Sequence, residues 1–474
     1  MISRRLVVSL AVLFGFAAAL VVGLDQPASV TPVFARPNIP TTPYMPLGNQ
    51  LSSTFYCAGA MVEGDDRSAE IVVANLTDSG ITGQLTVFTP DGAALPVPLD
   101  ISARGRIVIS LDDVVGAATV AAGAIVELER TGATVEQRST APTGVALSPC
   151  SNDASTQWYF ADGVSVDGVT YSLLLTNPYP DSAVVDISLV TATGLANPTE
   201  LQGYVVPPRS ISTIDISGSF ARDEEQLSIA VQSRRGRVIA AKSQIFNGGR
   251  RLGYSVMLGS PSVGDQWFFA DGETGTGIDE RYSIFNPTSE AIDVDVVFLP
   301  VDDAPELAPV TLTIDAEDTV LVDVAEVEGL PEGRHSASIR TFSTAAVVVE
   351  RALTRPAGRG VATSVVLGSR FGSPSWWLPT GVPTPTPGAI VVHNATNLDG
   401  TFTVSSLGPG GLAPITGLTD LVLAAGGVVA VDLTATDAVG DTLLVSSADV
   451  QLIVEQRPPQ GDQPGQGGAL AVPE

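Results

Sequence analysis

An aromatic motif recurs four times in this chain of 474 residues at an almost constant interval. It reads FYCAG, WYFADG, WFFADG and WWLPTG, and it begins at Phe55, Trp158, Trp267 and Trp376. The interval is much longer than the roughly 20–50 residues of a solenoid turn or a propeller blade. It matches a whole β-sandwich domain of about 100 residues. The motif therefore predicts four tandem copies of one domain.

Three further landmarks keep the same spacing. An Asn closes an apolar run in each copy, at Asn75, Asn177, Asn286 and Asn394. An Asp closes a later run, at Asp112, Asp215, Asp323 and Asp432. A Glu close to an Arg follows in three copies, at Glu136/Arg138, Glu350/Arg351 and Glu455/Arg457, whereas the second copy has Ala241 and Lys242.

Alternating apolar and polar residues predict strands in every copy. In 292–298, for example, Ile, Val, Val and Phe alternate with Asp, Asp and Val, and this places the apolar side chains on one face. The 47 Gly and 34 Pro favour frequent turns. No long amphipathic helix is evident after residue 30. We therefore predict an all-β fold of four tandem immunoglobulin-like β-sandwich repeats after an N-terminal transmembrane helix.

The landmarks place the four repeats at 51–152, 153–262, 263–371 and 372–457. The remaining residues, 458–474, are rich in Pro, Gly and Gln and are predicted to be disordered. We expect the repeats to form an extended rod, with a closed ring as the alternative.

Residues 1–24 predict export. Arg4 and Arg5 precede an uncharged run from Leu6 to Leu24, which is close to the roughly 20 residues that span a bilayer. This segment is a signal anchor or a signal peptide, since a late cleavage site at 33–35 leaves both open. Six prolines make 25–50 an extended stalk. We expect a single-pass protein of the cell membrane with its C-terminal domains outside, or otherwise a secreted protein.

The charge excludes one class of partner. The chain carries 24 Lys and Arg against 51 Asp and Glu, for a net charge of −27. Such a field repels phosphate backbones, so nucleic acid is not an expected partner.

The chain resembles the DUF5719 family, a domain of unknown function in actinobacterial envelope proteins. The resemblance rests on the aromatic motif, on the YSLLLTNP run at 171–178 and on the VVVERA run at 347–352. It covers about residues 50–457. Copy one departs from it at Phe55 and Cys57, and copy four departs at Pro379 and Thr380. The resemblance implies an exported all-β protein and offers no catalytic residues.

Cys57 and Cys150 are the only cysteines. An even count in an exported chain predicts a disulfide, which would tie the start of copy one to its end. A pair of free thiols with a redox or metal role is the alternative, but the sequence has no Cys-x-x-Cys and only two His.

Most of the other candidates favour structural roles. Trp158, Trp267 and Trp376 are possible ligand-stacking residues, although aromatic side chains at one position of every copy more often pack in a core. The Glu/Arg pairs are interpreted as exposed strand-end ion pairs rather than acid–base groups. Asp-Gly at 162–163 and 271–272 is interpreted as turn sequence, with weak calcium binding left open.

We predict no catalytic, cofactor-binding or metal-binding residues, since His335 and His393 lack partners at ligand spacing. The expected function is that of a non-catalytic exported scaffold in the cell envelope, not an enzyme. The alternative is a cell-wall polysaccharide-binding protein that uses the aromatic motifs. Expected partners are the cytoplasmic membrane, through the N-terminal segment, and envelope proteins or cell-wall glycan.

Overall fold

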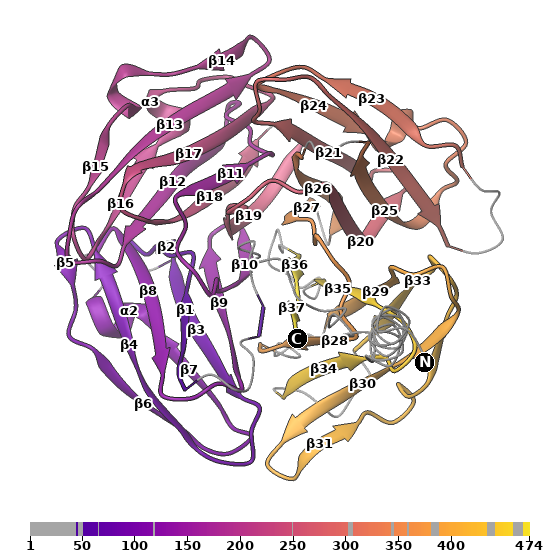
Figure 1. Ribbon diagram of the computed structural model, residues 1–474, viewed down its shortest axis with the longest axis horizontal. Helices are drawn as coiled ribbons and strands as arrows, with labels where there is room; N and C mark the ends of the chain where they lie inside the picture. Colours follow the sequence, from indigo (N-terminus) through magenta and orange to yellow (C-terminus); the bar gives the residue numbers. More distant parts are fainter. Residues whose placement is uncertain are drawn as a thin grey trace, which may run out of the picture. The chain divides into compact units, whose positions relative to one another are not determined.

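The computed structural model describes residues 44–45, 51–64, 66–116, 119–248, 250–301, 307–342, 346–357, 360–380, 388–433, 441–457 and 468–474. All of them belong to one compact unit, Pro40–Glu474. This unit consists almost entirely of antiparallel strands (Figure 1). The predicted membrane segment 1–24 and nearly all of the stalk 25–50 lie outside the described residues. In the part that is described, no helix is long and apolar enough to span a membrane.

Each copy folds into two antiparallel sheets. We call the sheet that contains the first strand of a copy sheet I and the other sheet II. In copy one, sheet I contains β1 (Ser53–Tyr56), β2 (Ala60–Met61), β4 (Ile81–Thr89), β5 (Gly92–Ala93), β6 (Val97–Ile101) and β8 (Ala121–Leu128). Sheet II contains β3 (Ser68–Asn75), β7 (Arg106–Ser110), β9 (Ala133–Ala141) and β10 (Gly144–Pro149). Helix α2 (Leu111–Val115) follows β7.

Copies two and three repeat this arrangement. Sheet I of copy two contains β11 (Gln157–Phe160), β13 (Ala183–Thr191), β14 (Gly194–Ala196), β15 (Tyr204–Val206) and β17 (Leu227–Arg235), and its sheet II contains β12 (Val169–Asn177), β16 (Ser210–Asp215), β18 (Ile239–Gly248) and β19 (Arg251–Leu258). Sheet I of copy three contains β20 (Gln266–Thr274), β22 (Ile292–Pro300), β23 (Val310–Ile314) and β25 (Gly333–Thr341), and its sheet II contains β21 (Asp279–Asn286), β24 (Asp318–Asp323), β26 (Val348–Ala357) and β27 (Gly360–Leu367). The short helices are η1 (Thr199–Leu201), α3 (Ile216–Ser219) and η2 (Val324–Glu326).

Copy four extends to the end of the chain. Its sheet I contains β28 (Ser375–Leu378), β30 (Gly400–Gly408), β31 (Gly411–Pro414), β32 (Leu421–Leu423), β34 (Thr442–Ser446) and β37 (Val472–Pro473). Its sheet II contains β29 (Ala389–Asn394), β33 (Val428–Asp432), β35 (Leu452–Arg457) and β36 (Ala469–Leu470). The prediction that 458–474 is disordered is therefore wrong for these last strands, which supply the edge strand that β10, β19 and β27 supply elsewhere.

Among the described strands, every sheet draws its strands from one predicted copy, except that β36 and β37 from the predicted tail join the two sheets of copy four. The strand order, however, is not that of an immunoglobulin domain, in which the first two strands share a sheet. In copy three, β20 lies in sheet I beside β25, whereas β21 lies in sheet II between β24 and β26. The all-β prediction is confirmed, and the immunoglobulin-like order is wrong. The chain changes sheets directly after the aromatic motif.

The repeated Asn has one structural role in all four copies, and each of these side chains is fully buried. Asn286 Nδ2 donates to the carbonyls of Glu290, Ile314 and Asp315, and its Oδ1 accepts from the backbone of Thr288. Asn75, Asn177 and Asn394 make the same set of contacts. One amide therefore satisfies the backbone of two neighbouring turns, as buried polar groups require.

The repeated Asp begins a short helix in the two middle copies. Asp215 accepts from the backbone of Gly218 at the start of α3, and Asp323 accepts from Ala325 at the start of η2. In copy one Ser110 takes the capping position of α2, and Asp112 lies in the first turn. These are ordinary N-caps, which satisfy otherwise free N–H groups.

Contacts between the copies run in a closed order. Strand β10 contacts β19, β19 contacts β27, β27 contacts β36, and β36 contacts β10. The segment that precedes copy one also contacts copy four, through a hydrogen bond of 2.9 Å from the Met45 N–H to the carbonyl of Pro473. The extended rod expected from the sequence is therefore wrong, because in a rod these two copies would not touch.

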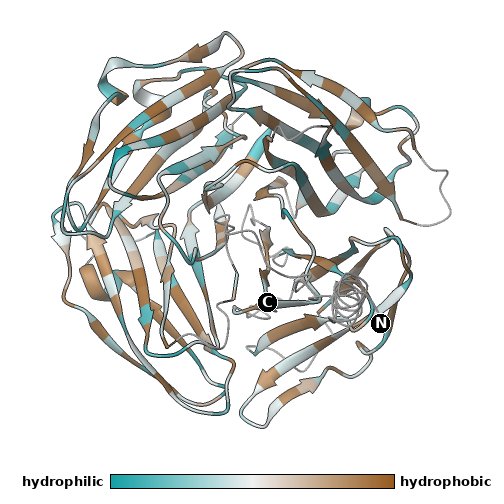
Figure 2. Cartoon of the chain, in the orientation of Figure 1, coloured by the Kyte–Doolittle hydropathy of each residue, from teal (hydrophilic) through white to brown (hydrophobic). Residues whose placement is uncertain are grey.

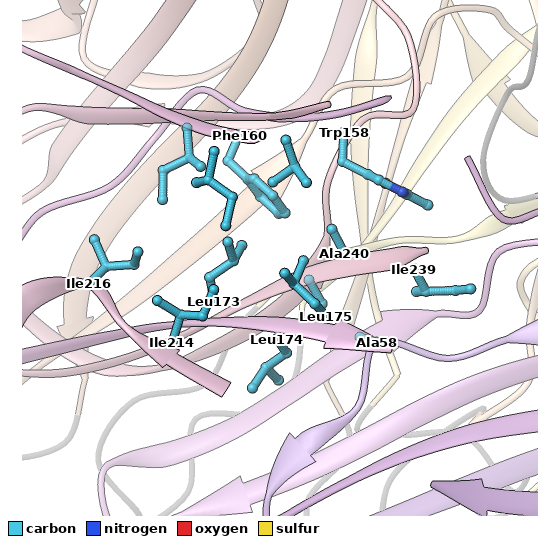
Figure 3. Close-up of a cluster of buried hydrophobic side chains, with 14 of the residues drawn as sticks. Ala58, Trp158, Phe160, Leu173, Leu174, Leu175, Ile214, Ile216, Ile239 and Ala240 are labelled. Atoms are coloured by element: carbon cyan, nitrogen blue, oxygen red, sulfur yellow. The ribbon is translucent and has the colours of Figure 1, made fainter. Parts of the chain in front are cut away.

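Buried apolar side chains form a hydrophobic core in each copy. Figure 2 shows that hydrophobic residues occur along the strands of all four copies. The core of copy two also takes in side chains from copy one, among them Ala58 and Ala121. Figure 3 shows Ala58 near Leu174 and Leu175 of copy two. The hydrophobic cores of neighbouring copies are thus continuous, and the copies are not separately packed domains.

Candidate functional site

The residues with chemical potential gather where one copy meets the next. We call these junctions seams 1–2, 2–3, 3–4 and 4–1. The first three seams each contain the Ala of the aromatic motif, which packs into the next copy. Ala58 lies in the core of copy two, Ala161 in that of copy three and Ala270 in that of copy four. A small residue at this position allows the backbone to approach the neighbouring copy.

A buried Glu of the following copy binds this backbone in three seams. Asp162 N–H donates to Glu350 Oε2 at 2.7 Å, and Ala270 N–H donates to Glu455 Oε1 at 2.7 Å. In seam 4–1, Thr380 N–H donates to Glu136 Oε2 at 3.2 Å. The three Glu side chains are at most 2% exposed. The interpretation of the Glu/Arg pairs as exposed strand-end pairs is therefore wrong, because each Glu reaches across a seam.

Seam 2–3 neutralises its carboxylates with one Lys and one Arg. Lys242 Nζ lies 2.5 Å from Glu350 Oε2, and both side chains are completely buried. Arg251 holds Asp162 with two hydrogen bonds of 2.9 and 3.0 Å. Burial opposes ionisation, but the charges of Arg251 and Lys242 hold the pKa of Asp162 below its usual value. For Glu350, burial prevails over Lys242 and raises the pKa.

Seam 3–4 contains the densest charge cluster. Arg351 binds Glu455 at 2.7 Å, and Arg355 binds Asp271 at 2.9 and 3.1 Å. Arg457 of copy four also binds Asp271, with Nε at 3.1 Å. Although burial raises it, the pKa of Asp271 is held well below its usual value by Arg355 and Arg457. Charged side chains of both copies therefore hold this seam together.

Seam 4–1 has a buried carboxylate without a direct ion pair among the described contacts. Arg106 donates from Nη1 to the carbonyl of Thr380 at 2.7 Å, on the same residue whose N–H binds Glu136. Burial raises the pKa of Glu136 to about 7, opposed by the hydrogen bonds from Thr380 and by the charge of Arg106. The Glu136 carboxyl group of this seam therefore changes its charge near neutral pH.

Seam 1–2 has neutral residues at the equivalent positions. Ala241 replaces the Glu, and Gly59 replaces the Asp that follows the motif. Gln137, at the position of Lys242 and Arg351, accepts from Gly59 N–H at 2.9 Å and donates to its carbonyl at 2.8 Å. The Gln137 amide therefore satisfies the backbone groups of Gly59 from within copy one. At the other seams a Glu of the next copy binds the equivalent backbone.

The predicted disulfide joins Cys57 and Cys150. It occupies the position at which copies two and three place a ring against a glycine. A Cβ built on Gly259 would lie 2.7 Å from the ring of Phe160, and one built on Gly368 would lie 2.6 Å from the ring of Phe269. The disulfide is thus a covalent substitute for an aromatic contact in copy one, where Cys57 replaces the Phe.

The three motif tryptophans are core residues. Trp158, Trp267 and Trp376 are at most 1% exposed. Their Nε1 atoms donate to backbone carbonyls of Val238, Val347 and Leu452 at 2.8, 3.0 and 2.7 Å. The packing role is confirmed. Their alternative role as ligand-stacking residues is wrong, because a buried ring presents no face to a ligand.

The Asp-Gly pairs do not serve as turns. Asp162 and Asp271 are buried ion-pair partners, and a Cβ on Gly163 or Gly272 would lie 2.6 or 2.4 Å from Tyr171 or His335. The glycines are required by close approach. Both Asp carboxylates are occupied by guanidinium groups, which leaves no free oxygen pair there for calcium.

The two histidines are also structural. His335 lies 3.1 Å from Glu280 in the interior of copy three. His393 is buried near the Gly427 carbonyl, and burial lowers its pKa to about 4. In the described part of the chain, no three His, Cys, Asp or Glu side chains lie close enough together to hold a metal ion.

A cavity of about 60 Å³ lies where the last strands of the four copies meet. Its lining includes Leu147, Met257, Val365 and Leu470, one from each copy. Sites for drug-sized ligands measure about 300–1,000 Å³. The cavity is therefore a packing feature of the closed arrangement.

Sequence reasoning missed Arg106, Gln137 and Arg251 as seam residues. Their partners come from other segments of the chain. Gln137 binds a residue 78 positions away, and Arg106 binds one 274 positions away. One signal was present in the sequence. The Glu is absent only in copy two, and the residues that face its position across seam 1–2 are neutral as well.

The resemblance to DUF5719 that the sequence predicts is confirmed over residues 108–250. The model of a family of unknown function, DUF5719, matches residues 108–250, which span the end of copy one and most of copy two. No curated protein matches the chain in sequence. Among solved structures, the crystal structure of Thermotoga maritima 1070 is 16% identical over 23% of this chain and 94% of its own chain, with a TM-score of 0.20.

Proposed function

We propose that the chain is a non-catalytic exported protein that acts as a structural or interaction scaffold in the cell envelope. One observation carries this proposal. The residues that recur in the copies are engaged in structural contacts: the buried Asn amides and Trp indoles bind backbone carbonyls within their own copy, and the seam Glu side chains bind the neighbouring copy. A catalytic role would require polar groups in one copy that are open to a substrate.

The compartment is part of the proposal. The disulfide between Cys57 and Cys150 supports an oxidising environment, since such bonds persist mainly outside the cytoplasm. The basic start and apolar run of residues 1–24 support a single-pass anchor in the cytoplasmic membrane, with the folded copies outside. Cleavage of that segment would give a secreted form of the same scaffold.

An envelope protein is the proposed partner in preference to cell-wall glycan. The glycan alternative depended on exposed aromatic platforms, and the three motif Trp rings are buried. Large apolar side chains do reach the surface on sheet I, where Leu195 is 41% and Val422 is 76% exposed. A protein partner can cover such isolated apolar residues.

In-cell photo-crosslinking tests this proposal. A photoreactive residue at Leu195 or Val422 of the membrane-localised chain is expected to capture a defined envelope protein, and one at the buried Ile187 is expected to capture none. Fractionation and external protease treatment give the location. A cytoplasmic chain with reduced cysteines, or turnover of cell-wall glycan by the purified chain, would overturn it.

A further inference from the structure

Lys242 is the only lysine in the chain, although the chain has 24 basic residues. Its side chain is completely buried in seam 2–3. The equivalent residue of the next copy, Arg351, binds a Glu across seam 3–4 in the same way. A guanidinium can make the ion pair but is not a nucleophile at neutral pH, whereas a lysine amine becomes one when it loses its proton. The single lysine thus adds a reactivity that its counterpart lacks.

The surroundings of Lys242 favour attack on a carboxyl group. Its Nζ lies 2.5 Å from Glu350 Oε2, and it also donates to the Asp162 carbonyl. The N–H of Asp162 donates to the same Glu350 oxygen at 2.7 Å. This N–H can stabilise negative charge that develops on the oxygen, as an oxyanion-hole donor does. The second oxygen, Glu350 Oε1, has no hydrogen-bond partner among the described residues.

Burial also favours the neutral form of the Glu350 carboxyl group. The side chains of Lys242 and Glu350 are 0% exposed, so water is excluded from the pair. Burial raises the pKa of Glu350 in spite of the charge of Lys242. The neighbouring Asp162 differs, because Arg251 holds it ionised and it is a poor target for an amine. Transfer of one Nζ proton to Glu350 Oε1 gives a neutral amine beside a neutral acid and leaves Oε2 as the carbonyl oxygen.

We propose that Lys242 and Glu350 form an isopeptide bond that cross-links copies two and three. The Nζ atom attacks Glu350 Cδ, and Oε2, held by the Asp162 N–H, becomes the amide oxygen. Two protons of the ammonium group leave with Oε1 as one water molecule. The step needs no oxidant, reductant or cofactor, and it places a covalent bond where seam 3–4 has the Arg351–Glu455 ion pair.

Peptide mapping of the full-length wild-type chain tests the proposal directly. The purified chain is reduced, denatured and digested, and the peptides are fragmented by mass spectrometry. The expected product is one branched species that joins the peptides containing Lys242 and Glu350, lighter than their sum by one water molecule. Complete recovery of the two linear peptides would overturn the proposal and leave an ordinary ion pair.

The chain itself suggests the matched control. Lys242→Arg copies the residue found at position 351 and preserves the charge, so the branched species is expected to disappear. A branched species that persists in this variant would assign the link to another residue and overturn the proposal. The wild-type measurement does not depend on how well the variant folds.

Discussion

Seams 1–2 and 3–4 join equivalent surfaces with different chemistry. Seam 3–4 is closed by Arg351, Arg355 and Arg457 on Glu455 and Asp271, whereas seam 1–2 has Gly59 and Gln137 at the same positions. Both seams bury the Ala that follows the motif in the next core. The difference shows that apolar insertion is the common feature and that ions are an addition. It also shows that the polar residues vary as a set at each seam, because the two sides must match.

The largest expected effect comes from removing one ion of seam 3–4. Glu455→Ala leaves Arg351 buried without its partner, and loss of one member of a buried pair costs about 3–5 kcal/mol. Gln137→Ala at seam 1–2 removes only neutral hydrogen bonds and should cost about 1–2 kcal/mol. Urea unfolding of both variants measures the difference. Equal losses would mean that the seams do not differ in energy.

The disulfide of copy one offers the next largest effect. Cys57→Ser with Cys150→Ser should lower the free energy of unfolding by about 2–4 kcal/mol, since the bond closes a long loop. Cys57→Phe with Cys150→Gly instead introduces the Phe160 and Gly259 solution of copy two. We expect this second pair to recover at least half of the loss in thermal unfolding. No recovery would show that copy one does not accept its neighbour's packing.

Seam 4–1 should respond to pH in a way that seam 3–4 does not. The pKa of Glu136 is raised to about 7 in the fold from an ordinary value of 4.5, so the folded state binds more protons between these values. Its contribution is complete below about pH 4.5 and is lost as the pH rises to 7, by up to about 3 kcal/mol. Glu136→Gln should abolish this slope in urea unfolding at several pH values. Asp271, whose pKa is lowered, changes stability in the opposite direction and only at more acidic pH.

The smallest effect is expected for a surface ion pair that lies close in sequence to Glu136. Arg138 lies 3.3 Å from Glu70, and both side chains are about one-third exposed. Exposed pairs contribute about 0–1 kcal/mol. Arg138→Ala should therefore leave the unfolding midpoint almost unchanged. A loss as large as that of Glu455→Ala would remove the distinction between seam and surface ions.

Repetition made much of the fold predictable. The spacing of the motifs gave the copy boundaries that the sheets respect, and the even cysteine count gave the disulfide. The strand order was not accessible, because alternation reveals the faces of a strand but not its neighbours. The last strands of copy four were missed despite a signal. The span 372–457 is more than twenty residues shorter than 263–371, so the repeat itself required more chain.

The seams were the least predictable part. A Glu followed by an Arg resembles a local pair, yet Glu350 binds Lys242, which lies 108 positions away, and Glu455 binds Arg351, which lies 104 away. No periodicity within one copy contains this information, since it concerns how neighbouring copies face each other. Only the joint absence of charge at Gly59, Gln137 and Ala241 points to it.

The position of β36 and β37 has a consequence for the order of assembly. These strands are synthesised after all the other described strands, and they complete both sheets of copy four. Copies one to three can pair all their strands earlier, because the chain is synthesised from its N-terminus and their residues are made first. Copy four, and with it the junction to copy one, must wait until β36 and β37 have been synthesised. A chain that is truncated before these two strands would therefore leave the closed order of contacts between the copies incomplete.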